Sequence, residues 1–158
     1  MIPKDLIVRK IKEGTVIDHI PAGQVLNVMK ILRIRGTEDY SVAMVMNVES
    51  EKLGKKDMLK VENRELDADE VNKISLLAPE ATISTIKNYR VVKKMKVRLP
   101  DEIKGILNCT NPNCISNQLR EPAVSSFRVI SRSPTLLACQ YCGTYVSQED
   151  VVAQYAKL

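Results

Sequence analysis

The stretch Gly14-Thr15-Val16-Ile17-Asp18-His19-Ile20-Pro21-Ala22-Gly23 decides how the first half of the chain folds. Its β-branched residues predict a half-buried strand, which ends at Pro21 because proline cannot continue a hydrogen-bonded ladder but can open a helix. Asp18 and His19, the only histidine, therefore lie near a strand end and face opposite sides if the strand is regular. A ligand-binding pair and an ordinary turn-capping pair both fit this position.

Further elements are predicted on both sides of this strand. We expect strands over residues 5–11, 15–20, 40–48, 57–62, 81–86 and 89–96, a loop over 49–56, a helix from Val25 to about Arg35 closed by Gly36, and a second helix that begins at the capping pair Asp67 and Glu70 and ends at Pro79. Two β-α-β units that share one antiparallel sheet, with both helices on one face, form a ferredoxin-like (split β-α-β) arrangement of the α+β class.

The composition changes near Pro100, which predicts a boundary between residues 1–98 and a second domain at 99–158. All four cysteines lie in the second part, as Cys109-x4-Cys114 and, 24 residues later, Cys139-x2-Cys142. Two close pairs of this kind are typical of a tetrathiolate zinc site in a small all-β, zinc-ribbon-like domain. Two disulfides and unrelated buried cysteines are the alternatives. Four thiolates would close the coordination shell of one structural ion and leave no place for a reacting water.

The charge pattern bears on the kind of partner. The chain carries a net charge of +5, which favours polyanions, whereas an aromatic fraction of 4% is low for a protein that stacks bases. Basic residues gather near the last strand of the first domain: Lys87, Arg90, Lys93, Lys94, Lys96 and Arg98. They are consistent with either a solvated surface or a site for a phosphate-bearing ligand. The sequence contains no phosphate-binding glycine loop and no nucleophile elbow, so it does not favour an enzyme. The first residues, Met1-Ile2-Pro3-Lys4-Asp5, lack the apolar region of a signal peptide, and no apolar run approaches the ~20 residues of a membrane span, so we expect a cytoplasmic protein without a membrane partner.

Five separate motifs, taken together and in their order along the chain, are more specific than any one of them alone. They are the opening stretch from Gly14 to Ala22, Gly54-Lys55-Lys56-Asp57-Met58-Leu59-Lys60-Val61-Glu62-Asn63, Ala78-Pro79-Glu80-Ala81-Thr82, Asn88-Tyr89-Arg90-Val91-Val92 and Cys109-Thr110-Asn111-Pro112-Asn113-Cys114-Ile115-Ser116. With these motifs the chain resembles the regulatory chains of aspartate carbamoyltransferase along essentially its whole length. The resemblance implies a non-catalytic subunit in pyrimidine biosynthesis. Residues 1–98 would be an allosteric nucleotide-binding domain for CTP and ATP, with UTP as a further candidate, and residues 99–158 a zinc domain that docks on the catalytic chain. Members pair into dimers that bridge two catalytic trimers.

The resemblance also assigns site residues. The nucleotide-binding positions are Ile11, Val16, Asp18, His19, Lys60, Ser84, Ile86, Tyr89, Val91 and Lys94. Among them, Asp18 would meet the ribose, His19 and Lys94 the phosphates, and Lys60 the base and ribose. Ile11 and Tyr89 would offer backbone groups to the base, while Val16 and Val91 form walls. The four cysteines match the metal ligands, and Asn111 and Asn113 match positions that face the catalytic chain. Ser84 and the pair Arg9-Lys10 depart from the family pattern.

One different class of function competes with this reading. A nucleic-acid-binding zinc-ribbon protein would also combine a positive charge with four paired cysteines. It would bind tRNA or duplex DNA with an affinity that falls steeply with salt, and it would ignore free nucleotides. The regulatory reading predicts the reverse, with nucleotides and no nucleic acid as ligands.

Overall fold

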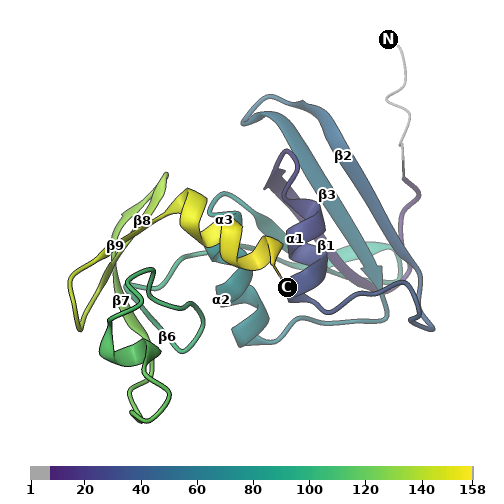
Figure 1. Cartoon of the computed structure of the whole chain (residues 1–158). Helices are drawn as coiled ribbons and strands as arrows, with labels where there is room; N and C mark the ends of the chain where they lie inside the picture. Colours follow the sequence, from purple (N-terminus) through teal and green to yellow (C-terminus); the bar gives the residue numbers. More distant parts are fainter. Residues whose placement is uncertain (1–7, 158) are drawn as a thin grey trace.

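The computed structural model describes residues 8–157 (Figure 1). Within this range an antiparallel sheet has the strand order β2-β3-β1-β4-β5. The elements of this part are β1 (Gly14–Pro21), α1 (Val25–Ile31), β2 (Val42–Ser50), β3 (Gly54–Glu62), α2 (Ala68–Leu77), β4 (Thr82–Lys87) and β5 (Arg90–Lys96). The elements from β1 to β4, in the order β1-α1-β2-β3-α2-β4, make a split β-α-β fold. Strand β5 is added at one edge of the sheet. The predicted fold class is confirmed.

The opening stretch forms β1, the central strand of this sheet. Ile17 pairs with Leu59 of β3 on one side and with Ile83 of β4 on the other, and all three side chains are buried. They belong to one apolar cluster with residues from both helices, including Val28 and Ile74. We call the opposite side of the sheet, which α1 and α2 leave uncovered, the outer face. Side chains alternate along each strand, so Val16 and Asp18 point to that face.

The segment before β1 differs from its prediction. Val8, Arg9, Lys10 and Ile11 are not part of any strand, and residues 5–7 of the predicted strand lie outside the described range. Both sides of β1 are already occupied by β3 and β4, so the segment cannot pair there. Its buried residue, Ile11, is 8% exposed.

Helix α1 ends earlier than the spacing of its apolar residues predicts. Arg33 adopts a left-handed φ of +57°, and the N–H of Ile34 donates to the carbonyl of Met29 at 3.0 Å. This is a Schellman-type ending with an arginine where glycine is usual, three residues before Gly36. Pro21 is the last residue of β1 rather than the first of the helix.

Helix α2 begins as predicted, because Asp67 accepts from the N–H of Glu70 at 2.8 Å and Glu70 accepts from the N–H of Asp67 at 3.1 Å. The hairpin between β2 and β3 is tighter than the predicted loop over 49–56, since both strands continue to Ser50 and Gly54.

The remaining chain forms a second antiparallel sheet with the order β6-β7-β8-β9. Its elements are β6 (Glu102–Lys104), the 3-10 turn η1 (Ile115–Asn117), β7 (Ser126–Arg132), β8 (Thr135–Cys139), β9 (Tyr145–Ser147) and a C-terminal helix α3 (Gln148–Ala156). The sequence reasoning missed α3, although Ser147 and Asp150 form a capping box at its start.

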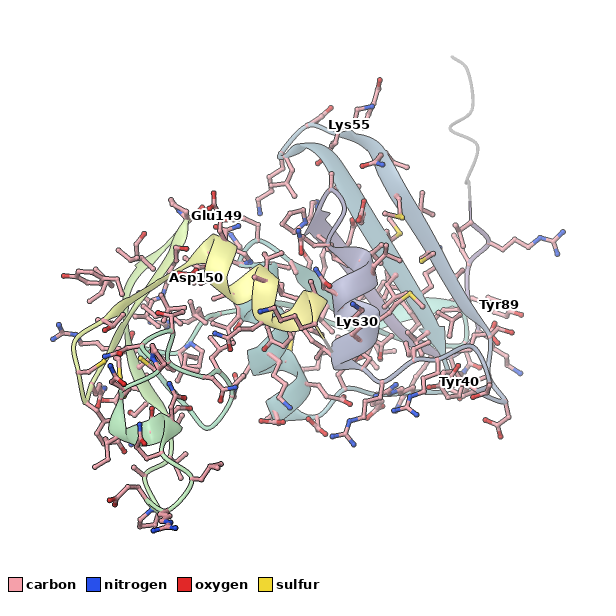
Figure 2. All side chains as sticks on the ribbon, in the orientation of Figure 1. Lys30, Tyr40, Lys55, Tyr89, Glu149 and Asp150 are labelled. Atoms are coloured by element: carbon pink, nitrogen blue, oxygen red, sulfur yellow. The ribbon has the colours of Figure 1, made fainter. Side chains whose placement is uncertain are left out.

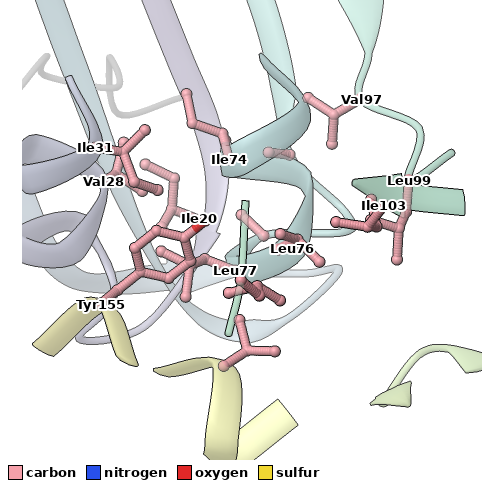
Figure 3. Packing of buried hydrophobic residues seen from close by; sticks show 14 of the residues in the cluster. Ile20, Val28, Ile31, Ile74, Leu76, Leu77, Val97, Leu99, Ile103 and Tyr155 are labelled. Carbon is pink, nitrogen blue, oxygen red and sulfur yellow. The ribbon is translucent and has the colours of Figure 1, made fainter. Parts of the chain in front are cut away.

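Helix α3 returns to the first sheet and lies alongside α1 and α2 (Figure 1). Its Tyr155 packs into the cluster that contains Ile20, Val28 and Leu77 (Figure 3). One apolar core therefore runs through both halves of the chain. No helix within residues 8–157 has the length and apolar character needed to cross a bilayer.

Candidate functional site

The four cysteine sulfurs converge at one end of the second sheet. Cys109 Sγ lies 3.6 Å from Cys142 Sγ, Cys114 Sγ lies 3.7 Å from Cys139 Sγ, and all four sulfurs lie within 4.8 Å of one another. A tetrahedral zinc ion with Zn–S bonds of about 2.3 Å requires sulfurs about 3.8 Å apart, which these separations match. They are far longer than the S–S bond of about 2.05 Å in a disulfide, so the disulfide alternative is wrong.

The loop that carries the first two cysteines is held by Asn117 of η1, a residue that sequence reasoning missed. Its Nδ2 donates to the carbonyls of Cys109 at 2.8 Å and Asn111 at 2.7 Å. Asn111 in turn accepts from the N–H of Asn113 at 3.0 Å. The loop is thus preorganised, with Asn113 exposed on its surface.

The thiols of the cluster differ in acidity. Hydrogen bonds from Thr144 lower the pKa of Cys142 to about 6, whereas burial raises the pKa of Cys109 to about 12. Zinc binds thiolates, so Cys142 is ready to bind the ion at neutral pH and the ion must displace the proton of Cys109. Three of the sulfur-bearing residues are buried and Cys142 is exposed. The residues present fit a closed structural metal site.

A second group of predicted residues lines up on the outer face of the first sheet. Lys60 of β3 is paired with Val16 of β1, Val16 with Ser84 of β4, and Ser84 with Lys94 of β5. Paired residues share a face, so these four side chains form one transverse row, which we call the outer-face row. With strands about 4.8 Å apart, its two lysines are separated by about 14 Å at the backbone.

Neighbouring rows complete the arrangement on this face. Asp18 is paired with Thr82, and Thr82 with Lys96. On the other side of the outer-face row, Ile86 is paired with Val91 across a bulge in the β4–β5 ladder. Pairing across the strands therefore brings Val16, Asp18, Lys60, Ser84, Ile86, Val91 and Lys94 to the same face.

His19 reaches the outer face because β1 is not regular. The pairing of β1 with β3 shifts between Ile17 and Ile20, and His19 adopts a φ of +58°. Its Nδ1 lies 3.1 Å from Oγ1 of Thr82, the residue opposite Asp18. Asp18 and His19 were expected on opposite sides only if the strand is regular, and that condition does not hold because a β-bulge redirects the imidazole.

Polar contacts on this face tie the predicted residues to others that sequence reasoning missed. Lys56 Nζ lies 2.8 Å from Oδ1 of Asp18, and the N–H of His19 donates to the same carboxylate oxygen at 2.6 Å. Asp18 is therefore neutralised locally. In the sequence nothing distinguishes Lys56 from its neighbours Lys55 and Lys60, since strand register decides which lysine meets the carboxylate.

Lys60 connects the outer-face row to the segment before β1. Its Nζ donates to the carbonyls of Arg9 at 3.2 Å and Val8 at 3.4 Å. Burial lowers the pKa of Lys60, the charge of Asp18 opposes this effect, and Lys10 adds to it. An anion beside this ammonium group would raise the pKa of Lys60 again.

The two residues expected to offer backbone groups lie near each other in the fold. The N–H of Tyr89 donates to the carbonyl of Lys12 at 3.0 Å, which fixes the segment next to Ile11 against the β4–β5 turn. A ligand would therefore be met by the carbonyl of Tyr89 rather than by its N–H. Figure 2 shows this turn, at Tyr89, and the β2–β3 tip, at Lys55, toward opposite ends of the strands of the first sheet.

A buried carboxylate, also missed from the sequence, fixes the end of β1. Asp57 is fully buried, and its Oδ2 accepts from the N–H groups of Gly23 at 2.8 Å and Val25 at 3.1 Å. Its Oδ1 accepts from the N–H of Asn47 at 2.9 Å, at a bulge in β2. The bulge that positions His19 is thus followed by a firmly held turn into α1.

Two sequence profiles match consecutive parts of the chain. Residues 6–98 match the aspartate carbamoyltransferase regulatory chain, allosteric domain, and residues 101–152 match the aspartate carbamoyltransferase regulatory chain, metal binding domain. The aspartate carbamoyltransferase regulatory chain of Hyperthermus butylicus is 58% identical over 152 residues, which cover 96% of this chain and 95% of that protein. The regulatory chain of Korarchaeum cryptofilum is 54% identical over 151 residues, with 96% of each protein covered.

These matches confirm the resemblance drawn from the separate motifs. They extend over nearly the full length of both partners, and they name regulatory rather than catalytic chains. The clustered cysteines lie within the part that matches the metal binding domain. The chain belongs to the family of aspartate carbamoyltransferase regulatory chains, the non-catalytic subunits of that enzyme complex.

Proposed function

We propose that the outer face of the first sheet binds nucleoside triphosphates and that CTP and ATP, with UTP as a further candidate, act there as allosteric effectors. The observation that carries the proposal is the outer-face row, which places Lys60 and Lys94 on one open face with Val16 and Ser84 between them. A row with a cation at each end, about 14 Å apart, suits a long ligand that carries charge along its length.

The phosphates would lie at the end of the row nearest Lys94 and His19. Lysine binds phosphate as a point charge, and the imidazole, held at Nδ1 by Thr82, can donate from its other nitrogen when it is protonated. Asp18 would repel phosphate, but Lys56 neutralises it at 2.8 Å. Its carboxylate is suited to accept from a ribose hydroxyl.

The base and ribose would lie near Lys60 and the segment before β1. Lys60 is partly buried there, and the carbonyls of Ile11 and Tyr89 would accept from an exocyclic amino group. Val16 and Val91 supply apolar walls, with Ser84 and Ile86 beneath the ligand. Recognition of this kind does not require aromatic stacking.

For the rest of the chain we propose a structural and connecting role. The four cysteines would hold one Zn²⁺ ion, which closes the loop over residues 109–114, and Asn111 and Asn113 on this loop would face the catalytic chain. Residues 1–98 would act as the allosteric domain and residues 99–158 as the domain that docks. Pairs of regulatory chains would then bridge two catalytic trimers and pass nucleotide binding on to them.

The nucleotide site is tested by Lys94→Gln, with Lys93→Gln as the matched control. The two lysines are neighbours on β5, but Lys93 is paired with Thr85 and faces the other side of the sheet. Losing a charged hydrogen bond costs about 1.5–3 kcal/mol, so calorimetry should show CTP and ATP binding weakened about tenfold or more by the first change. Equal binding by both variants and the unaltered chain would refute the assignment.

The connecting role is tested by mixing the chain with aspartate carbamoyltransferase catalytic trimers, with and without zinc. A larger complex whose activity responds to CTP or ATP is expected only with zinc. Assembly that is independent of zinc would contradict the proposed role of the cysteine cluster. Assembly without any nucleotide response would contradict the proposed regulation.

A further inference from the structure

A cavity of about 620 Å³ lies where α1, α2 and α3 meet, on the side of the first sheet opposite the outer face. It is lined by Lys30, Arg33 and Arg35 from α1 and the following loop, and by Lys73 of α2. Tyr155 of α3 and three isoleucines complete its wall. The volume is in the range of ordinary ligand sites. Its cationic lining sets it apart from the apolar core around it.

Among the residues that the structure describes, every charged one that lines this cavity is a cation. Two of the four have local partners: Lys73 pairs with Asp69 at 3.0 Å, and Lys30 donates to the carbonyl of Ala156 at 2.9 Å. Figure 2 shows Lys30 on α1 beside the end of α3. Within residues 8–157, no carboxylate forms an ion pair with the guanidinium of Arg33 or Arg35. Neither guanidinium is therefore neutralised by an ion pair within the described residues.

The loop that presents the two arginines is fixed. Arg33 is the left-handed residue that ends α1, and Glu38 accepts from the N–H groups of Arg35 at 2.6 Å and Gly36 at 2.8 Å. These backbone hydrogen bonds lower the pKa of Glu38 and occupy both of its oxygens. The carboxylate nearest in sequence is thus used by the backbone and does not pair with either guanidinium.

Tyr155 adds an independent observation at the same place. The residue is 5% exposed, and its hydroxyl is buried without a hydrogen-bond partner within the described range. In Figure 3 its ring extends from α3 into the space between α1 and α2. A buried hydroxyl without a partner is costly and calls for an explanation. Burial and the charge of Asp69 raise the pKa of Tyr155, so it remains a hydrogen-bond donor.

We propose that this cavity binds a small oligophosphate anion through Lys30, Arg33, Arg35 and Lys73, with the Tyr155 hydroxyl as a further donor. The polar side chains at the cavity are donors, which is the lining that a phosphoryl group requires. Its residues come from both halves of the chain, since Ile106 and Tyr155 belong to the second. A bound anion would therefore strengthen the packing of α3 on α1 and α2. Free pyrophosphate and the phosphate tail of a nucleotide both carry such an oligophosphate group.

The test uses the full zinc-loaded chain with pyrophosphate, ATP and CTP as separate probes in calorimetry. All titrations are repeated in the Lys60→Gln/Lys94→Gln double variant, which removes both lysines of the outer-face row. We expect saturable pyrophosphate binding that persists in this variant and weakens at least about tenfold when Arg33→Gln/Arg35→Gln is added. The control Lys104→Gln/Arg120→Gln removes the same charge elsewhere and should leave pyrophosphate affinity unchanged. If ATP or CTP binding in the Lys60→Gln/Lys94→Gln variant also depends on Arg33 and Arg35, the phosphate group that the cavity binds can be that of a nucleotide.

Two results would overturn the proposal: no saturable pyrophosphate binding, or binding that Arg33→Gln/Arg35→Gln does not weaken. Either could occur with normal CTP binding on the outer face, so failure here is distinguishable from failure of the nucleotide site. Tyr155→Phe guards against a folding defect, because removing a hydroxyl without a partner should leave the melting temperature unchanged or higher. It should still weaken pyrophosphate binding several-fold, and an unchanged affinity would remove Tyr155 from the site.

Discussion

His19 Nδ1 lies 3.1 Å from Oγ1 of Thr82, although a regular strand would direct His19 to the opposite side of the sheet from Asp18. The bulge in β1 makes this contact possible, and the φ of +58° at His19 is part of it. A non-glycine residue in this region is strained by about 1–2 kcal/mol. Strain of this kind is typical of functional sites.

Replacing His19 by glycine should separate stability from binding. Glycine relieves the left-handed strain, but the contact with Thr82 is lost and the unfolded chain gains conformational entropy, so the free energy of unfolding should change by less than about 1 kcal/mol. CTP and ATP binding should nevertheless weaken by about tenfold, because the imidazole is gone. Calorimetry and urea unfolding measure the two effects. Asn63→Gly, at a φ of +54° off the proposed site, is the control and should leave binding intact.

Replacing Asp57 by alanine should destabilise the first sheet strongly. Three backbone N–H groups, those of Gly23, Val25 and Asn47, would lose the fully buried carboxylate that accepts from them. Each unsatisfied donor costs about 1–3 kcal/mol, so a loss of at least about 3 kcal/mol is expected in urea unfolding. Asp39→Ala, at an exposed loop position, is the comparison and should change stability by less than about 0.5 kcal/mol. Similar losses in both variants would show that the carboxylate is not a structural centre.

Removing the metal should unfold the second sheet before the first. The four cysteines join the loop at 109–114, which belongs to no strand, to the end of β8, so a bound ion would hold these two segments together. Chelation, or Cys114→Ser, should raise amide hydrogen exchange in β6 to β9 much more than in β1 to β4. Added zinc should restore protection after chelation but not in the variant. Unchanged exchange in β7 and β8 without metal would contradict a structural ion.

Lys60 should make stability depend on pH at alkaline values. Its pKa is lowered by burial from 10.5, so between the folded and unfolded pKa values the unfolded chain binds more protons. The free energy of unfolding therefore rises with pH in that window. Relative to Lys60→Met, the unaltered chain should gain stability as the pH approaches 10.5, as measured by urea unfolding at a series of pH values. Lys93→Met is the control. If the free energy of unfolding of the unaltered chain rises by the same amount relative to Lys93→Met, Lys60 is not the cause of the pH dependence.

Much of this protein could be predicted from local sequence. The helix start at Asp67 and Glu70 lies in a single turn, and the cysteine pairs lie within single loops, so neighbouring residues alone decide their geometry. The strand of the opening stretch was predicted for the same reason. The start of α3 was equally local, and its capping pair of Ser147 and Asp150 was the signal that could have revealed it.

What the tertiary structure decided depends on register between strands that are distant in sequence. Pairing of β1 with β3 and β4 determines that Lys56 meets Asp18, and the bulge in that ladder turns His19 to the same face. The packing of α3 on α1 and α2 is driven by the burial of apolar surface between segments that are distant in sequence. This packing creates the cavity at Tyr155. The sequence by itself determined which residues could bind metal and phosphate. Long-range pairing and packing decided which of them meet, because these contacts join segments that no local pattern relates.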